Sequence, residues 1–190
     1  MFRLKAPSKD EIRRFLVEQT RSSLSYPEVG MTASELPSGY NIDHHRILLG
    51  NGEVTWRRAM EAIRTWQMFS LRWVCLYWPT APIELGTNVA ISVLHFGFYS
   101  LHACRIVYVV DDDGPVKRYG FAYGTLEGHA ESGEERFTVE WNQAEDKVVY
   151  EILAFSRPNK IAAKLGYLAA RYLQRAFAGD SMEAMLRAIR

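Results

Sequence analysis

The sequence predicts an α+β fold in which a curved antiparallel sheet wraps around a long C-terminal helix. Apolar residues alternate with a period of two from Thr87 to Phe155, as they do in strands with one buried face. Short turns rich in glycine, asparagine and aspartate separate these runs, so neighbouring strands are expected to be antiparallel. The period then changes to about 3.6 over Ile161–Ala176, which predicts one helix packed on the sheet.

Two helices and a strand are predicted before this strand region. Ser8 and Glu11 form a capping box, which indicates that a short amphipathic helix begins there. Tyr40–Leu49 has the composition of a first strand. A second helix opens near Glu53, and its apolar positions continue through Leu76 before two prolines interrupt them.

The strand region contains five runs of alternating apolar residues. They are Val89–Val93, Cys104–Val110, Phe121–Thr125, Phe137–Trp141 and Val148–Ala154. Alternation within the second run predicts that Tyr108 shares a face with Cys104 and Ile106. Tyr123 and Tyr150 occupy equivalent positions in their own runs, so the three tyrosines are expected on the inner face.

The C-terminal helix is expected to begin at Ser156–Pro158 and to end at Gly179–Asp180, where Asp180 and Glu183 would cap a short last helix. We place Tyr172 on its apolar face and Arg171 on a basic, solvated stripe. This order of elements is similar to that of the helix-grip fold of the START and pollen-allergen-like ligand-binding proteins. A likeness of fold leaves the function open.

Composition indicates a single globular domain over residues 1–190, with 1–25 as a helical extension and 26–190 as its main body. The 48% hydrophobic content is ordinary for such a domain. A net charge of +1 offers no strong attraction to nucleic acid or to an anionic membrane. Arg72 and two prolines interrupt the most apolar stretch, 68–83, so we expect a cytoplasmic protein without membrane segments.

Neither a metal nor a cofactor is predicted. Cys75 and Cys104 have no metal or redox spacing and are expected to be buried apolar residues. His44 and His45 are neighbours on a strand and therefore point to opposite faces. The sequence contains none of the glycine-rich nucleotide motifs and no nucleophile elbow.

The segment Tyr123–Arg136 holds the densest potential chemistry. If it is extended, His129 and Glu131 share a face, and a carboxylate beside an imidazole raises the imidazole pKa and fixes its tautomer. A general base needs this arrangement, so His129 and Glu131 are the catalytic candidates. The alternative is a hairpin loop, Gly128–Gly133, with solvated glutamates and a histidine that bonds to backbone.

Five residues are candidates for ligand binding. They are Arg105, Tyr108, Tyr123, Glu135 and Tyr150. Arg105 lies within an apolar strand, so its charge must meet a carboxylate, such as Glu140 or Glu151, or a bound anion. Glu134 and Glu135 precede a strand, and one of them could turn inward.

Several stretches resemble those of a known family. The most specific is Gly120–Phe137, and the others are Tyr26–Gly30, Pro37–Tyr40, Leu49–Gly52, Cys104–Val109 and Ala154–Pro158. On these residues the chain resembles the proteins grouped as domain of unknown function 1990, also called uncharacterised protein family 0548. The resemblance covers roughly Tyr26 to the C-terminus. It implies membership of a family without an established biochemical role, and so it assigns no catalytic residue.

Three functions are compatible with these observations. The first is the binding of a small hydrophobic or amphipathic molecule between the sheet and the long helix. The second is an enzyme that uses His129 with a nearby glutamate as general acid and base. The third is a structural or partner-binding protein with a filled core.

Overall fold

The computed structural model describes residues 2–159 and 167–190, and these residues confirm the predicted α+β fold with an antiparallel sheet. The strands are β1 (Phe2–Arg3), β2 (Asn41–Gly50), β3 (Val74–Tyr77), β4 (Asn88–His95), β5 (Phe98–Asp112), β6 (Val116–Thr125), β7 (Glu131–Asn142) and β8 (Lys147–Pro158). Their order across the sheet is β2-β8-β7-β6-β5-β4-β3, and β1 pairs with β5. Every pair of neighbours in the described sheet is antiparallel.

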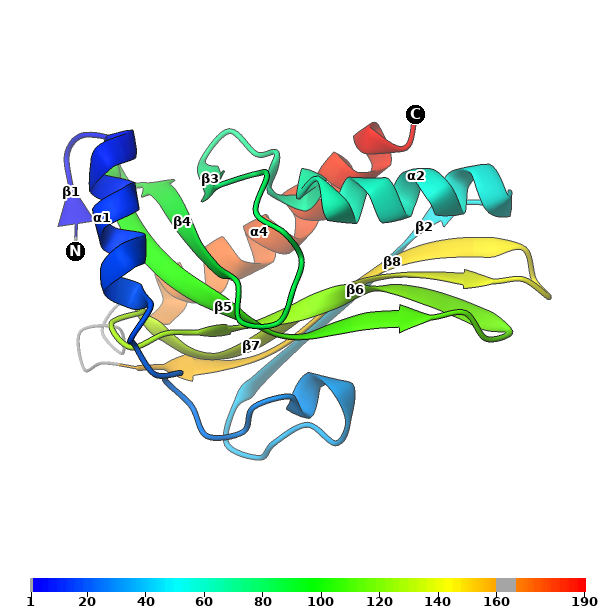
Figure 1. Cartoon of the computed structure of the whole chain (residues 1–190), viewed down its shortest axis with the longest axis horizontal. Coiled ribbons are helices and arrows are strands. Elements are labelled where there is room, and N and C mark those ends of the chain that lie inside the picture. Colours follow the sequence, from blue (N-terminus) through cyan, green and yellow to red (C-terminus); the bar gives the residue numbers. More distant parts are fainter. Residues whose placement is uncertain (1, 160–166) are drawn as a thin grey trace.

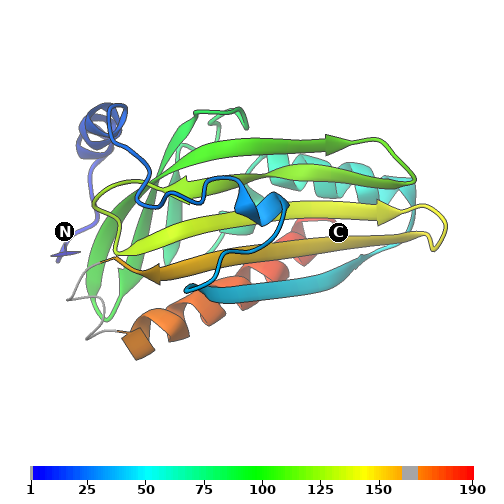
Figure 2. The ribbon, with the colours of Figure 1, turned by 90° about the horizontal axis from the view of Figure 1, so that it is seen from below.

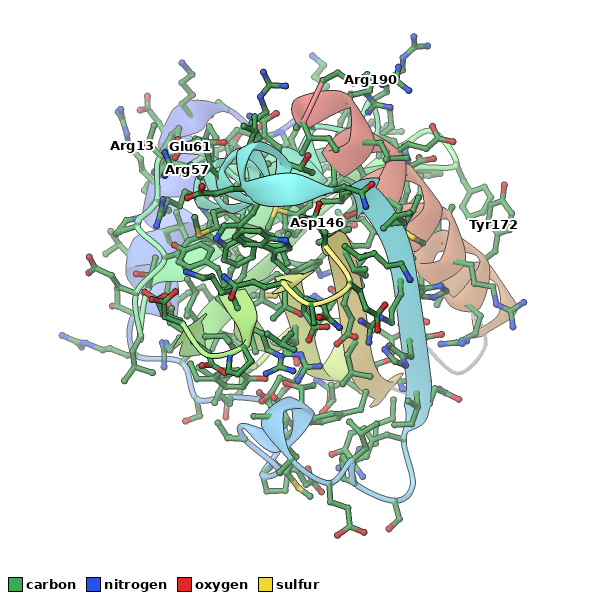
Figure 3. The ribbon with its side chains drawn as sticks, turned by 90° about the vertical axis from the view of Figure 1, so that its right-hand side faces the viewer. Arg13, Arg57, Glu61, Asp146, Tyr172 and Arg190 are labelled. Carbon is green, nitrogen blue, oxygen red and sulfur yellow. The ribbon has the colours of Figure 1, made fainter. Side chains whose placement is uncertain are left out.

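The sheet separates two layers of the molecule (Figures 1 and 2). The helices are α1 (Lys9–Gln19), α2 (Gly52–Arg64) and α4 (Tyr167–Ala188), with short 3-10 turns η1 (Met31–Ala33) and η2 (Gln67–Phe69). Helices α2 and α4 cover one face, which we call the inner face. The segment 20–40 with η1 crosses the other, outer face, as the view along the strands shows (Figure 3). A curved antiparallel sheet around a long C-terminal helix is the helix-grip arrangement.

The main core lies between the inner face and the helices. Phe121, Phe137 and Tyr150 project from the sheet and are fully buried, and Trp66 and Met185 pack against them from the helical layer. Burying each large apolar side chain contributes about 1.5–3 kcal/mol relative to its exposure. This burial of alternate residues on the inner face explains why the strands could be recognised from the sequence.

Helix α4 is continuous through Gly179 and Asp180, so the predicted break and short last helix are wrong. Asp180 accepts a hydrogen bond of 2.7 Å from the Trp73 indole, and Ser181 is buried against Tyr150. These contacts outweigh the roughly 1 kcal/mol that a glycine costs within a helix. Residues 161–166 of the predicted helix lie outside the described residues. Within the described parts, no helix has the length and apolar character that a bilayer span requires.

The predicted helix start at Ser156–Pro158 is also wrong, because these residues extend β8. Pro158 pairs with Glu131, so β7 supplies a partner strand to the end of this segment. Tyr172 is 66% exposed and points away from the sheet (Figure 3), since it lies on the side of α4 opposite the buried Ser181. The basic residue Arg171 instead meets the sheet, as described below.

The apolar residues after α2 form a strand and not an extension of the helix. Helix α2 ends at Arg64, and η2 leads into β3, which pairs with β4 at the edge of the sheet. A run of only four residues cannot be assigned by periodicity, since it fits both patterns. Alternation within β3 leaves Cys75 exposed, contrary to the prediction, whereas Cys104 is buried as expected.

Candidate functional site

The inner face of β7 carries a carboxyl group, that of Glu135. It lies opposite Tyr123 of β6 and Ala154 of β8. The Tyr123 hydroxyl donates a hydrogen bond of 2.8 Å to the Glu135 carboxylate. Tyr123 is buried, whereas Glu135 keeps some accessible surface although it points towards the helical layer.

Burial changes the chemistry of Glu135. Desolvation raises the pKa of its carboxyl group from 4.5 to about 7, although the Tyr123 hydrogen bond acts in the opposite direction. The charge of Asp43 adds to the upward shift. Glu135 therefore changes its protonation state near neutral pH, which makes it a candidate for ligand binding or proton transfer.

An ion pair connects α4 to β2 beside this carboxyl group. Both terminal nitrogens of Arg171 contact the Asp43 carboxylate, at 2.5 and 2.7 Å, in a bidentate arrangement. Glu131 lies close enough that the charge of Arg171 lowers its pKa, but burial outweighs this effect and raises the pKa overall. The described part of the site thus contains three carboxyl groups and one guanidinium.

Aromatic rings form the apolar part of the site. Phe69 of η2 lies between the sheet and α4, with its ring centroid 6.2 Å from Tyr123 and 5.3 Å from Phe177. Phe69 also lines an open hollow of about 590 Å³ beside the edge strand β3.

Tyr150 lies deeper on the inner face and has a partner in the helix. Its hydroxyl is 2.9 Å from the Ser181 hydroxyl of α4, and both side chains are buried. The charge of Glu135 contributes to an upward shift of the Tyr150 pKa, after the larger effect of burial. Of the predicted ligand-binding residues, the structure thus groups Tyr123, Glu135 and Tyr150.

His129 contacts Glu131 through the backbone and not through the carboxylate. The Glu131 amide donates a hydrogen bond of 3.0 Å to Nδ1 of His129, which leaves the ring proton on Nε2. Burial lowers the pKa of His129 to about 4, the opposite of the shift expected from a carboxylate neighbour. Its ring lies 4.5 Å from that of His102, so it takes part in a histidine pair.

The loop predicted at Gly128–Gly133 is shorter than expected, because β7 already begins at Glu131. Glu134 and Glu135 both lie within this strand, and it is Glu135 that turns inward. Glu134 points outward and is only 2% exposed. Within the described residues, no group of three histidine, cysteine, aspartate or glutamate side chains is arranged to hold a metal ion.

Arg105 and Tyr108 face outward and are not part of this group. Arg105 bonds to the Asn88 side chain at 2.8 Å and to the Gln19 carbonyl oxygen at 3.0 Å, so it caps the end of α1 and meets no described carboxylate. Its predicted partners Glu140 and Glu151 pair with other arginines. A β-bulge between Ile106 and Tyr108 moves the tyrosine to the outer face.

Asp43, Arg171 and Phe69 belong to the site but were not singled out from the sequence as ligand or catalytic candidates. Asp43 and Arg171 are 128 positions apart, and only the packing of α4 on β2 brings them together. No sequence signal marked Asp43, because Asn41 and His45 share its face of β2 and make a polar residue there unremarkable. For Phe69 there was none, because an aromatic residue in an apolar run is normally part of the core.

Comparison with known proteins identifies the family. A domain of unknown function, DUF1990, matches residues 25–184. A UPF0548 protein of Dictyostelium discoideum is 35% identical over 208 residues, covering 100% of this chain and 96% of the relative. A UPF0548 protein of Arabidopsis thaliana is 33% identical over 153 residues, covering 78% of this chain and 73% of the relative.

Among solved structures, the hypothetical protein jhp0584 from Helicobacter pylori has a similar fold. The TM-score is 0.59 at 11% identity, over 88% of this chain and 96% of that chain. Identity at this level shows a shared fold and nothing of function. The matches in sequence go further: the chain belongs to the DUF1990 family, whose curated relatives are named UPF0548 proteins.

Proposed function

We propose that the protein binds a small, mostly apolar molecule between the sheet and α4, with the polar group of that molecule at Glu135 and Tyr123. The observation that carries this proposal is a partly exposed carboxyl group on the inner face of a helix-grip sheet. A carboxyl group that served only the fold would be paired with a cation or would lie on the surface. Among the described residues, the hydrogen bond that Glu135 accepts is donated by the neutral hydroxyl of Tyr123.

The charges around the site select the polar group of the ligand. Three carboxyl groups, those of Asp43, Glu131 and Glu135, accompany the single guanidinium of Arg171 in the described part of the site. Such a surrounding favours hydrogen-bond donors and cations over anions. The ligand class is therefore an apolar body that carries a hydroxyl or an amino group.

The apolar body of the ligand would contact the aromatic rings. Phe69, Phe137 and Phe177 lie within 5.3–6.3 Å of one another by ring centroid, next to Tyr123. A mostly apolar wall with a few placed polar groups is the usual composition of a small-molecule site. The open hollow that Phe69 lines beside β3 would offer an approach to these rings from the sheet edge.

The proposal can be tested by NMR with three probes of the same shape: cyclohexylamine, cyclohexanol and cyclohexanecarboxylate. We expect the amine and the alcohol to shift the Tyr123 ring signals in a saturable manner, and the carboxylate to leave them unchanged. Glu135→Gln should lower the affinity for the amine by about tenfold, as expected for loss of a charged hydrogen bond. The exposed Glu127→Gln is the matched control and should bind as the wild type does. If no probe moves the Tyr123 signals, the interior is filled and the structural alternative is favoured.

A second candidate function is acid–base catalysis by Glu135. A carboxyl group with a pKa of about 7 beside a tyrosine hydroxyl matches what a general acid or base needs at neutral pH. In this enzyme, Glu135 and not His129 would transfer the proton, because burial holds His129 neutral. A reaction whose pH profile has its inflection near 7, and which Glu135→Gln abolishes, would support it. Turnover that survives this substitution would exclude Glu135 as the acid or base.

A further inference from the structure

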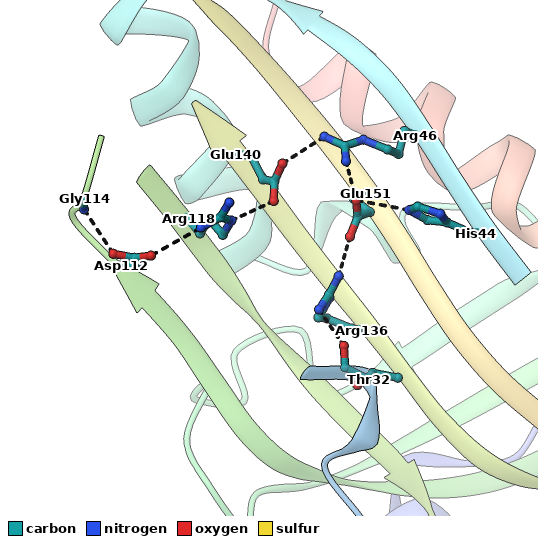
Figure 4. Close-up of polar contacts among 9 residues, drawn as sticks. All are labelled: Thr32, His44, Arg46, Asp112, Gly114, Arg118, Arg136, Glu140 and Glu151. Atoms are coloured by element: carbon teal, nitrogen blue, oxygen red, sulfur yellow. Dashed lines mark hydrogen bonds and ion pairs between the residues drawn. The ribbon is translucent and has the colours of Figure 1, made fainter. Parts of the chain in front are cut away.

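A second pocket, of about 450 Å³, lies on the outer face of the sheet, opposite the site described above. Its floor is formed by β6, β7, β8 and β2, and Leu36 of the outer segment covers one side. Charged side chains line it from four strands (Figure 4). They are His44 and Arg46 of β2, Arg118 of β6, Arg136 and Glu140 of β7, and Glu151 of β8.

Ion pairs fix the positions of these charges. Glu151 contacts Arg46 at 2.9 Å and Arg136 at 2.5 Å, and His44 approaches it at 3.2 Å. Glu140 contacts both Arg46 and Arg118 at 2.8 Å. A network held from several strands is preorganised, so a ligand would not have to order these side chains on binding.

The lining of the pocket has an excess of positive charge. Three guanidinium groups accompany two carboxylates, a difference of one, and His44 adds charge when it is protonated. Burial alone would raise the pKa of Glu151, but its contacts with His44 and Arg136 outweigh this and lower it, so the carboxylate is ionised at neutral pH. Asp112 contacts Arg118 at 3.4 Å, but it is half exposed and does not line the pocket. A ligand with a single negative charge matches this lining.

Two buried polar atoms in the pocket have no hydrogen-bond partner in the described structure. They are Nε of Arg136 and Oγ1 of Thr138. Thr138 is only 2% exposed, and leaving such a hydroxyl unbonded costs about 1–3 kcal/mol. The two residues are two positions apart on β7 and therefore project from the same face. Both atoms can donate a hydrogen bond, so the group that would satisfy them is a hydrogen-bond acceptor.

The remaining walls of the pocket are apolar. Leu36, Val110 of β5 and Leu153 of β8 line it, and each is only partly buried. The pocket thus combines two unused donors and a positive excess with room for a short hydrocarbon chain.

We propose that this outer pocket is a binding site for a small monocarboxylate. The carboxylate accepts hydrogen bonds from the Thr138 hydroxyl and from Nε of Arg136, and the hydrocarbon part lies on Val110 and Leu153. This site is independent of the inner one, because it lies on the other face of the sheet and prefers the opposite charge.

Butyrate is a suitable probe, and butyramide is its neutral counterpart of the same shape. We expect butyrate to shift the Val110 methyl signals in a saturable manner, and butyramide and inorganic phosphate to bind at least several-fold more weakly. Thr138→Val keeps the shape of the side chain and removes the hydroxyl, so the fold should be retained and butyrate should bind about tenfold more weakly. Val110→Phe fills the pocket and should abolish binding without touching a polar contact.

Glu135→Gln is the matched control, because it alters only the inner face. It should leave butyrate binding unchanged, while Thr138→Val should leave the response of Tyr123 to cyclohexylamine unchanged. The proposal is wrong if butyrate shifts nothing at saturating millimolar concentrations, if butyramide or phosphate binds as tightly, or if folded Thr138→Val binds butyrate like the wild type. Any of these results would leave the inner-site proposal standing.

Discussion

Tyr123 and Glu135 face each other across β6 and β7, and the tyrosine hydroxyl donates a hydrogen bond of 2.8 Å to the carboxylate. The pair lies on the side of the sheet that α4 covers, where the neighbouring residues are aromatic. Because desolvation is the largest influence on Glu135, its carboxyl group holds a proton to about pH 7. The pH dependence of stability therefore reports on this pair.

Replacing Glu135 by glutamine is expected to stabilise the protein in alkaline solution. The pKa of Glu135 is raised on folding, so its contribution to stability is complete below about pH 4.5 and is lost as the pH rises through about 7. Glutamine cannot ionise. The free energy of unfolding of Glu135→Gln, relative to that of the wild type, should therefore increase by about 1–3 kcal/mol between pH 5 and pH 8.5. Urea unfolding at the two pH values measures this difference. The exposed Glu127→Gln serves as control, and an equal pH dependence in wild type and Glu135→Gln would show that Glu135 is well solvated.

The pair formed by Arg171 and Asp43 should stabilise the attachment of α4 to β2. The two side chains are 16% and 17% exposed, so their interaction is only partly screened by water. We expect a double-mutant cycle with Arg171→Met and Asp43→Asn to give a coupling of about 1–2 kcal/mol in the free energy of unfolding. The exposed pair of Arg57 and Glu53 is the comparison and should couple by less than about 0.5 kcal/mol. If the two substitutions at Arg171 and Asp43 had additive effects, as at the exposed pair, the ion pair would not stabilise the attachment of α4 to β2.

Glu134 is expected to fix the outer segment before β2. Its carboxylate accepts hydrogen bonds from the Tyr26 hydroxyl, from the amide groups of Gly30 and Thr32, and from the Thr32 hydroxyl. Glu134→Gln replaces one acceptor oxygen by a donor and should cost about 2–4 kcal/mol. Hydrogen exchange at Gly30 and Thr32 should accelerate in this variant. It should not change in Glu35→Gln, since Glu35 is exposed in the same segment, and unchanged protection in both variants would refute the role.

Gly124 should tolerate no side chain, because Tyr26 lies directly against it. A Cβ atom at this position would stand 2.1 Å from the tyrosine hydroxyl oxygen. We expect Gly124→Ala to lower the free energy of unfolding by about 2–4 kcal/mol. The control is Gly179→Ala within α4, where a Cβ meets nothing within 4 Å and the better helix propensity should stabilise by about 0.5–1 kcal/mol. Thermal unfolding of the two variants should therefore shift in opposite directions.

The parts of the fold that were predictable are those in which local pattern and burial agree. Alternation from β4 to β8 and the capping box at Ser8 are both present, the latter with Ser8 and Glu11 bonded in both directions. Where tertiary contacts decided the outcome, the local pattern misled. The Trp73 indole and Tyr150 hold α4 intact through Gly179, and pairing with β7 extends β8 to Pro158.

The candidate site was predictable only in part for the same reason. Tyr123 and Tyr150 follow from alternation, whereas the sequence left open which of Glu134 and Glu135 turns inward; the structure groups both tyrosines with Glu135. The same rule predicted Tyr108 on the inner face, but one bulge residue moves it to the outer face. A bulge leaves no clear mark in a sequence. Arg105 satisfies its charge on the carbonyl groups that end α1, a partner 86 positions away.

A crystal structure of the protein soaked with cyclohexylamine tests the central claim most directly. Ligand binding between the sheet and α4 predicts electron density for the amine beside Glu135, with its nitrogen about 3 Å from the carboxylate and its ring against Phe69 or Phe177. Full occupancy of that position by the wild type, and its loss in Glu135→Gln under the same soak, is the expected result. Ordered water alone beside Glu135, or amine bound only outside the inner face, would contradict the account.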